Sequence, residues 1–171
     1  EKLELSATLY DAVGKQVAQR RTRVSDGKEG ITKETLTLKV TKPHRWNLND
    51  PYLYTLKAEL LSNGKRIDGC ETKVGLRTLD FDPNKGFALN GNWMKVKGVC
   101  LHHDAGVLGA VVPPEVWERR LNNLKEIGVN AIRMSHNPQA PVVYDLCDQL
   151  GLLVMDEASD EWEFPKRKWI K

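Results

Sequence analysis

The spacing of apolar residues changes near residue 80, and this change limits the possible folds more than any other feature of the sequence. Up to that point apolar and polar residues alternate, over residues 3–9 and again over residues 36–40. Such alternation is typical of strands with one buried face. Beyond residue 80, apolar residues recur with helical spacing between short apolar runs. We therefore expect an all-β domain at residues 1–80 and an α/β domain at residues 81–171.

Turn signals divide residues 1–80 into several expected strands. Asn63-Gly64, a strong hairpin signal, separates residues 53–61 from a returning strand at residues 66–77. Short strands without a helical segment between them are typical of an antiparallel β-sandwich, and we expect an immunoglobulin-like one. About five or six strands are expected, which is few for that fold, so a first strand is expected before residue 1.

Residues 81–171 combine a small hairpin with an α/β unit. The hairpin is expected at residues 87–94, turning at Asn90-Gly91. The α/β unit has three apolar strands, at residues 96–101, 129–134 and 152–155, and two helices between them, at residues 113–127 and 141–150. Strands that alternate with helices in this way pair in parallel through right-handed crossovers. The unit is too short to close on itself.

Polar residues follow each of these three apolar strands. The three groups are His102-His103-Asp104, then Arg133 with Ser135-His136-Asn137, then Asp156-Glu157 with Asp160-Glu161. Because ligands bind at the carboxyl ends of parallel strands, the three groups predict one shared site. Each group also has a structural interpretation: Arg133 could simply neutralise Glu157, for example. The convergence of all three favours the site.

The net charge of +3 comes from the end of the chain. Lys166, Arg167, Lys168 and Lys171 contribute four positive charges, and the remaining residues sum to −1. We therefore expect no basic face on the folded chain and no nucleic-acid partner. No apolar run approaches the roughly 20 residues of a membrane span, so no membrane partner is expected either.

The spacing of cysteines and histidines excludes several kinds of site. Cys70, Cys100 and Cys147 show no C-x-x-C spacing, and we expect all three to be structural. The sequence contains no H-E-x-x-H metal motif, no glycine-rich phosphate loop and no G-x-S-x-G nucleophile motif. The residues themselves therefore predict no metal site and no cofactor.

Several segments resemble glycoside hydrolase family 2, and within it the β-galactosidases. Trp46–Tyr54 is similar to the W…P-x-L-Y strand of the sandwich domain that precedes the barrel, and Val74–Thr78 to the strand that ends that domain. The barrel motifs L-N-G, K/R-G-V-N-x-H-x-D, N-A-I-R-x-S-H-x-P, Y-D-L-C-D and D-E-A are matched at Leu89–Gly91, Lys97–Asp104, Asn130–Pro138, Tyr144–Asp148 and Asp156–Ala158. The resemblance implies that residues 81–171 hold the first three strands and two helices of a truncated (β/α)8 TIM barrel.

The resemblance also implies roles for the residues after the strands. The expected substrate-binding residues are His102, His103, Asp104, Arg133, His136 and Asn137. Asp156 and Glu157 are expected to contact these residues and not the substrate. Asp160, Glu161 and Trp162 form a possible subsite. In some members the position of Glu161 binds magnesium together with a histidine two residues later. Here that later residue is Glu163, which leaves Glu161 a weak metal candidate, and no cofactor is expected.

The activity implied is retaining hydrolysis of terminal β-linked sugars, with β-galactosides first, by two glutamates that follow the fourth and seventh barrel strands. Both glutamates are expected downstream of residue 171, so the chain alone is expected to be inactive. β-Glucuronidase and β-mannosidase activities remain open, as do a non-catalytic carbohydrate-binding module and a member that has lost its downstream glutamates. The expected partner is a β-linked oligosaccharide or glycoside, and the parent is expected to be a homo-oligomer. The cellular compartment cannot be inferred.

Overall fold

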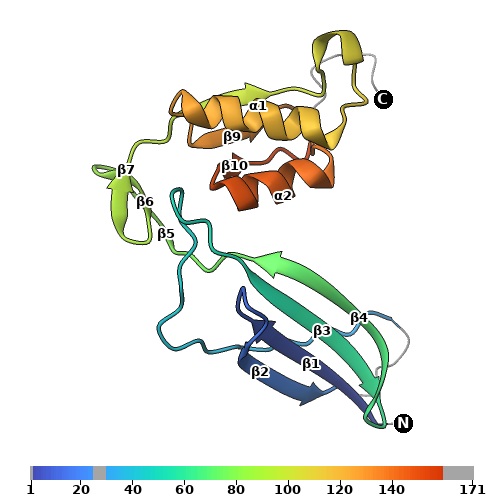
Figure 1. The fold of residues 1–171 in the computed structure, drawn as a ribbon. Coiled ribbons are helices and arrows are strands. Elements are labelled where there is room, and N and C mark those ends of the chain that lie inside the picture. The colour runs from blue at the N-terminus through green and yellow to red at the C-terminus, as the bar shows by residue number, and fades with distance from the viewer. Residues whose placement is uncertain (1, 25–29, 160–171) are drawn as a thin grey trace. The chain divides into compact units, whose positions relative to one another are not determined.

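The computed structural model of the chain describes residues 2–24 and 30–159. The chain divides into two compact units, each of which is built from two stretches of sequence. Unit 1 consists of Glu1–Trp46 and Tyr52–Leu76, and unit 2 of Asn47–Pro51 and Arg77–Lys171. Figure 1 shows the elements of both units in chain order.

A four-stranded antiparallel sheet forms the centre of unit 1 (Figure 1). Its strands are β1 (Leu3–Tyr10), β2 (Gln16–Arg23), β3 (Tyr54–Ser62) and β4 (Lys65–Val74), in the order β2-β1-β3-β4. The β3–β4 hairpin turns at Asn63-Gly64, where Ser62 pairs with Lys65, which confirms the hairpin predicted there. Strands β2 and β4 lie at the two edges of the sheet.

The strand predicted at residues 36–40 is wrong. Leu36, Leu38 and Val40 are half-buried while their neighbours are exposed, so the alternation of faces persists. No ladder joins this segment to another strand among the described residues, and a strand requires such a partner for its backbone N–H and C=O groups. The described part of unit 1 therefore contains a single sheet, and the expected immunoglobulin-like sandwich of two sheets is not confirmed.

The central strand β1 buries polar positions that its apolar alternation would leave exposed. Ser6 and Thr8 are buried, whereas Leu5 and Ala7 are half-buried. Thr8 keeps a hydrogen-bond partner, because its Oγ1 accepts from Gln19 Nε2 at 3.1 Å. That bond offsets the cost of removing the hydroxyl from water. Because β1 is flanked by β2 and β3, position in the sheet decides burial here more than the residue pattern does.

Trp46 is the largest fully buried side chain of unit 1. Its backbone N–H donates to the carbonyl of Leu76 at 3.0 Å. A Cβ on Gly75 would lie 2.9 Å from the Trp46 side chain, closer than side-chain carbons approach one another. The absence of a side chain at residue 75 therefore allows the tryptophan to pack against this backbone, which gives a physical reason for glycine within Val74–Thr78.

Unit 2 contains two three-stranded sheets. The first is antiparallel and consists of β5 (Leu79–Asp82), β6 (Gly86–Leu89) and β7 (Asn92–Met94), which confirms the predicted hairpin and adds a strand before it. The second is parallel, in the order β10-β9-β8, and consists of β8 (Gly98–Leu101), β9 (Ala131–Met134) and β10 (Leu153–Met155). A 3-10 turn, η1 (Gly106–Leu108), follows β8. The predicted parallel pairing is confirmed.

Two helices connect the parallel strands, as predicted. Helix α1 (Pro114–Glu126) begins with proline and carries Glu115 in its first turn, where a carboxylate is favoured by the helix dipole. Helix α2 (Pro141–Leu150) also begins with proline and ends at Gly151, whose φ of 73° is the left-handed conformation that glycine adopts at low cost. No described helix is long and apolar enough to span a membrane.

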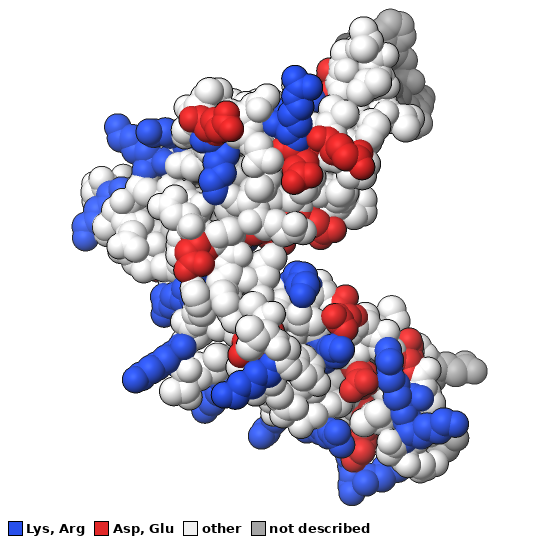
Figure 2. Space-filling model, in the orientation of Figure 1, with Lys and Arg blue, Asp and Glu red and all other residues white. Residues whose placement is uncertain are grey.

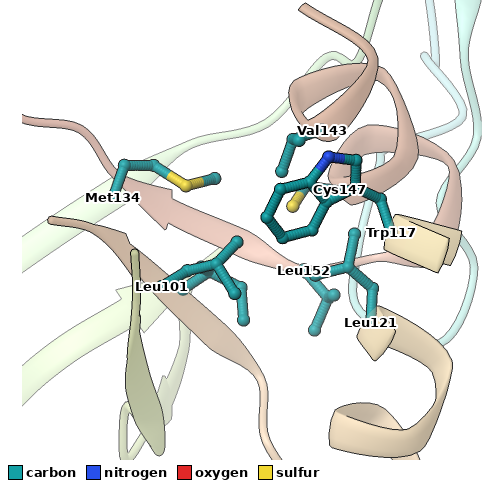
Figure 3. Packing of buried hydrophobic residues seen from close by; sticks show 8 residues of the cluster. Leu101, Trp117, Leu121, Met134, Val143, Cys147 and Leu152 are labelled. Carbon is teal, nitrogen blue, oxygen red and sulfur yellow. The ribbon is translucent and has the colours of Figure 1, made fainter. Parts of the chain in front are cut away.

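The core of unit 2 lies between the parallel sheet and the helices (Figure 3). Eight buried residues, from β8, α1, β9, α2 and the position just before β10, form one cluster: Leu101, Trp117, Leu121, Ile132, Met134, Val143, Cys147 and Leu152. Figure 3 shows the Trp117 ring between Leu121 and Val143, close to the Cys147 sulfur. Apolar burial of this kind is the main term that holds the unit together.

Burial in this cluster raises the pKa of the Cys147 thiol to about 12 from its ordinary 9.0. The folded state therefore holds the proton more tightly than the unfolded state, so the thiol's contribution to stability is complete below pH 9 and is lost as the pH rises through 12. By pH 10.5 we expect a loss of about 2 kcal/mol in the free energy of unfolding. The measurement is chemical denaturation at pH 7.5 and 10.5 of the chain and of Cys147→Ala. The difference in the free energy of unfolding between the two proteins should shrink at high pH. Equal losses of stability in both proteins between pH 7.5 and 10.5 would contradict the expectation.

Segment 47–51 belongs to unit 2 although it precedes β3 in the chain. Lys125, at the end of α1, donates from Nζ to the Leu48 carbonyl at 2.8 Å and also to the Leu150 carbonyl. Gly151 lies so close to the Leu48 carbonyl that a Cβ at residue 151 would overlap it. One ammonium group and one glycine therefore hold the segment against the ends of both helices.

Candidate active site at the carboxyl ends of the parallel strands

The three parallel strands place side chains in register on the face opposite the helices. Cys100 pairs with Arg133, and Arg133 pairs with Met155, so these residues of β8, β9 and β10 stand in one row. Leu101 and Met134 point the other way and are buried in the apolar cluster. The chain therefore passes, at the carboxyl end of each strand, from a packed apolar run into polar residues.

Glu157 connects two of the predicted site residues. Arg133 Nε donates to Glu157 Oε1 at 2.5 Å, and His136 Nδ1 lies 3.4 Å from Glu157 Oε2. The Glu157 side chain is only 20% exposed, so its two oxygens are committed to these partners. The Cys100 sulfur and the Glu157 carboxylate together raise the pKa of Arg133 above its ordinary value. The ion pair foreseen between Arg133 and Glu157 is confirmed, and it also orients His136.

The rings of His102 and His136 lie edge to face, with centroids 5.4 Å apart. Their loops are tied together through the Leu101 carbonyl, which accepts from the Ser135 N–H at 3.0 Å and from the buried Gln139 Nε2 at 3.3 Å. Two imidazoles that follow different strands thus face each other from fixed backbones. Both histidines are exposed and can donate or accept hydrogen bonds.

Asp156 is held from the side of helix α2. The Tyr144 hydroxyl donates to Asp156 Oδ1 at 2.8 Å, and it accepts the Gln139 N–H at 3.0 Å. The same carboxylate oxygen accepts the N–H of Glu157 at 3.1 Å. Burial, followed by the bond to Asp156, raises the pKa of Tyr144, so the phenol keeps the proton that it donates. Asp156 therefore fixes the backbone from which Glu157 extends.

The other predicted residues are less closely connected. His103, Asp104 and Asn137 are exposed, and Arg120 Nη1 donates to the backbone carbonyl of Asp104 at 2.6 Å. Asp160, Glu161 and Trp162 lie outside the described residues. Within the described ranges, no three His, Cys, Asp or Glu side chains come together as a metal site would require.

Cys100 belongs to this site but was not predicted to, whereas its neighbour Ser135 lies in one of the predicted polar groups. Cys100 is exposed beside Arg133, whose Nη1 lies 3.6 Å from the sulfur, so it does not pack as a buried hydrophobe; a purely structural role for it stays a prediction. The buried Ser135 hydroxyl and the Arg133 guanidinium lower the pKa of the Cys100 thiol. Cys100 lies two residues before His102, which follows β8, and the period of two along a strand is the signal that could have placed Cys100 on the same side as His102. Cys70 is also exposed, whereas Cys147 is buried as expected.

Cys100 should react with iodoacetamide several-fold faster than Cys70 at pH 7.5, because the thiolate is the nucleophile and its neighbours favour it at Cys100. Mass spectrometry of partly alkylated chain measures both sites in one sample, and the buried Cys147 should stay unmodified. Arg133→Met should slow Cys100 toward the rate of Cys70. Equal rates at Cys70 and Cys100 in the unsubstituted chain would contradict the expectation.

Comparison with protein-family models matches nearly the whole chain. Residues 1–77 match the model described as "Glycosyl hydrolases family 2", and residues 83–163 match "Glycosyl hydrolases family 2, TIM barrel domain". The second match covers all the described residues of the candidate site.

Known proteins similar to this chain include two glycosidases and a solved member of the same family. A β-galactosidase of Bacteroides ovatus is 46% identical over 97% of the chain, and a β-glucuronidase of Bacteroides fragilis is 37% identical over 82%. A crystal structure of a glycosyl hydrolase family 2 member from Bacteroides cellulosilyticus superposes with a TM-score of 0.91 at 37% identity, covering 99% of the chain. The chain spans 20%, 22% and 22% of these three proteins, respectively.

Proposed function

This chain belongs to glycosyl hydrolase family 2, and from that membership we propose that the whole protein is a retaining exo-glycosidase for terminal β-linked sugars, with β-galactosides first. The proposal rests on one observation above all. His102, Arg133, His136 and Glu157 come from three different strand ends and are joined by contacts into one polar rim. We further propose that β8, α1, β9, α2 and β10 are the beginning of a TIM barrel, whose active sites lie at this end of the strands.

The rim is suited to holding a sugar. Two imidazoles 5.4 Å apart offer hydrogen bonds to neighbouring hydroxyls, and their backbones are fixed through Leu101. Arg133 contributes a positive charge that Glu157 balances, so the rim is polar without a large net charge. A neutral sugar ring with many hydroxyls fits such a surface. In this proposal His102 and His136 touch the substrate, and Glu157 is a positioning residue.

Retaining hydrolysis also needs two carboxyl groups about 5 Å apart, one as acid/base and one as nucleophile. Asp156 and Glu157 do not suit these roles, since Tyr144 and a backbone amide occupy Asp156 while Arg133 and His136 occupy Glu157. We propose that the catalytic pair is supplied by parts of the whole protein other than the residues described here. The 171-residue chain alone should then be inactive.

A β-glucuronidase is the alternative suggested by the Bacteroides fragilis relative. A glucuronide carries a carboxylate that needs a cation in the site. Among the described rim residues, Arg133 is the one with a permanent positive charge, and Glu157 already neutralises it. The described part of the rim therefore favours a neutral sugar, such as a galactoside.

The test is to assay the whole protein on 4-nitrophenyl β-galactoside, β-glucuronide and β-mannoside under identical conditions. The proposal expects the largest kcat/KM for the galactoside and no turnover above the buffer blank by the 171-residue chain. A preference for the glucuronide would contradict the proposed galactoside specificity but not the proposed hydrolysis of β-linked sugars. No hydrolysis of any of the three by folded whole protein would overturn the proposal.

A further inference from the structure

Two adjoining cavities run along the edge strand β2 of unit 1. One, of about 540 Å³, lies between Ala18–Thr22 and the segment Thr35–Lys39. The other, of about 410 Å³, continues along the same segment to Tyr52 and Tyr54. Lys39 lines both, so together they form one elongated depression, which we name the β2 groove. Each cavity has a size typical of ligand sites.

The β2 groove is strongly basic. Five cationic side chains line it: Lys15, Arg20, Arg21, Lys39 and Lys42. The one carboxylate in its lining, Asp11, accepts the backbone N–H groups of Val13 and Lys15 at 3.1 and 2.8 Å. Within residues 2–24 and 30–159, none of the five cations forms an ion pair. A depression lined by uncompensated charge of one sign attracts ligands of the opposite sign.

Elsewhere in unit 1, cationic side chains form ion pairs with carboxylates. On β3 and β4, Lys57 pairs with Glu71 at 3.0 Å and Arg66 with Glu59 at 3.6 Å. Unit 1 as a whole contains 14 Lys and Arg against nine Asp and Glu, a balance of +5 that the chain total of +3 conceals. Basic side chains are spread over the surface of unit 1 in the lower part of Figure 2. The expectation that no face of the folded chain is basic is therefore wrong.

Aromatic side chains line one end of the β2 groove. His44 and Tyr52 stack with ring centroids 4.0 Å apart and planes 12° from parallel, and Tyr54 meets Tyr52 edge-on at 5.0 Å. The Tyr52 hydroxyl accepts the backbone N–H of Ala12 at 3.0 Å, which leaves its hydrogen to donate to a ligand oxygen. Tyr54 is buried, and its hydroxyl accepts the backbone N–H of His44 at 2.8 Å, which fixes this end of the groove. Aromatic faces with polar edges suit the mixed apolar and hydroxyl surface of a sugar ring.

We propose that the β2 groove binds an acidic oligosaccharide, whose sulfate or carboxylate groups pair with Arg20, Arg21 and Lys39 while one ring packs at the His44–Tyr52 end. Guanidinium and ammonium groups bind such anions through charge-assisted hydrogen bonds. The groove is made entirely of unit 1 residues, so this binding is separate from the rim of β8 to β10. It would attach the protein to a charged glycan while hydrolysis proceeds elsewhere.

The test measures binding of fluorescent dextran sulfate, carboxymethyl dextran and neutral dextran oligosaccharides of equal length to the 171-residue chain in 150 mM NaCl. The groove variant is Arg20→Gln/Arg21→Gln/Lys39→Gln. The control variant, Lys65→Gln/Lys85→Gln/Lys95→Gln, removes the same charge outside the groove. We expect binding of one or both charged dextrans, a loss of at least about 10-fold in the groove variant, and little change in the control.

Several outcomes would overturn the proposal. These are failure of both charged dextrans to bind, equal weakening by the groove and control variants, equal binding of neutral dextran, and tighter binding of an oligothymidylate of the same charge. Circular dichroism of each variant checks that the fold is intact, and a Tyr52→Leu variant probes the aromatic end without changing charge. Because binding is read without hydrolysis, a negative result leaves the proposed glycosidase activity untouched, and the reverse also holds.

Discussion

Replacing Glu157 by glutamine is expected to lower kcat/KM of the whole protein on its aryl β-glycoside by about 100-fold, the scale that follows when reacting groups are displaced by about 1 Å. The carboxylate receives Arg133 Nε at 2.5 Å and lies 3.4 Å from His136 Nδ1, so it orients two rim side chains at once. Glutamine keeps the shape but removes the charge that pairs with the Arg133 guanidinium. The loss should therefore be kinetic, with the unfolding midpoint changed little.

Glu126→Gln is the matched control, because Glu126 is an exposed carboxylate at the end of α1 with no ion pair among the described residues. Its activity should equal that of the unsubstituted protein. Glu157→Asp, which keeps the charge on a shorter side chain, should recover part of the activity lost in the glutamine variant. Equal activities for Glu157→Gln and Glu126→Gln would show that Glu157 does not position the rim.

Replacing Gly151 by alanine is expected to lower the free energy of unfolding by about 2–5 kcal/mol. The left-handed conformation at φ 73° costs a residue with a Cβ about 1–2 kcal/mol. In addition, the new methyl group would overlap the Leu48 carbonyl, a backbone group that cannot rotate away, and overpacking of that kind costs about 1–3 kcal/mol more. Segment 47–51 would have to move, which would also disturb the bond from Lys125 to Leu48.

Gly128→Ala separates these two costs. Gly128 has a similar φ of 89°, but no atom lies within 4 Å of the position of its Cβ. It should therefore lose only the conformational part, about 1–2 kcal/mol. Chemical denaturation of both variants gives the difference directly. If both variants lose the same amount, the close approach of Leu48 to Gly151 contributes nothing to stability.

The α/β unit could be predicted from the sequence because its signals are local. Pro114 and Pro141 mark the helix starts, and Gly151 marks an end. Short apolar runs between helices pair in parallel for reasons of handedness and length that any such chain shares. The Arg133–Glu157 pair could also be foreseen, since Arg133 lies near the end of one parallel strand, Glu157 follows another, and the two carry opposite charges.

Features that depend on distant partners could not be predicted in this way. Residues 36–40 have the alternation of a strand, but pairing requires a neighbour that no pattern within the segment specifies. Segment 47–51 joins unit 2 through backbone contacts at Leu48, which leave no trace in residue type. The β2 groove was hidden because net charge was averaged over the whole chain, while its cations gather along one strand edge.

Binding of galactose to the whole protein by isothermal titration calorimetry, in the unsubstituted form and with His102→Ala or His136→Ala, tests the central proposal most directly. If the rim at the ends of β8 and β9 holds the sugar, each substitution removes a hydrogen bond to the sugar. The dissociation constant for galactose should then rise by about 10-fold. The unfolding midpoints should stay close to the original, since both histidines are exposed. An unchanged dissociation constant in both folded variants would contradict the assignment of this rim as the sugar site.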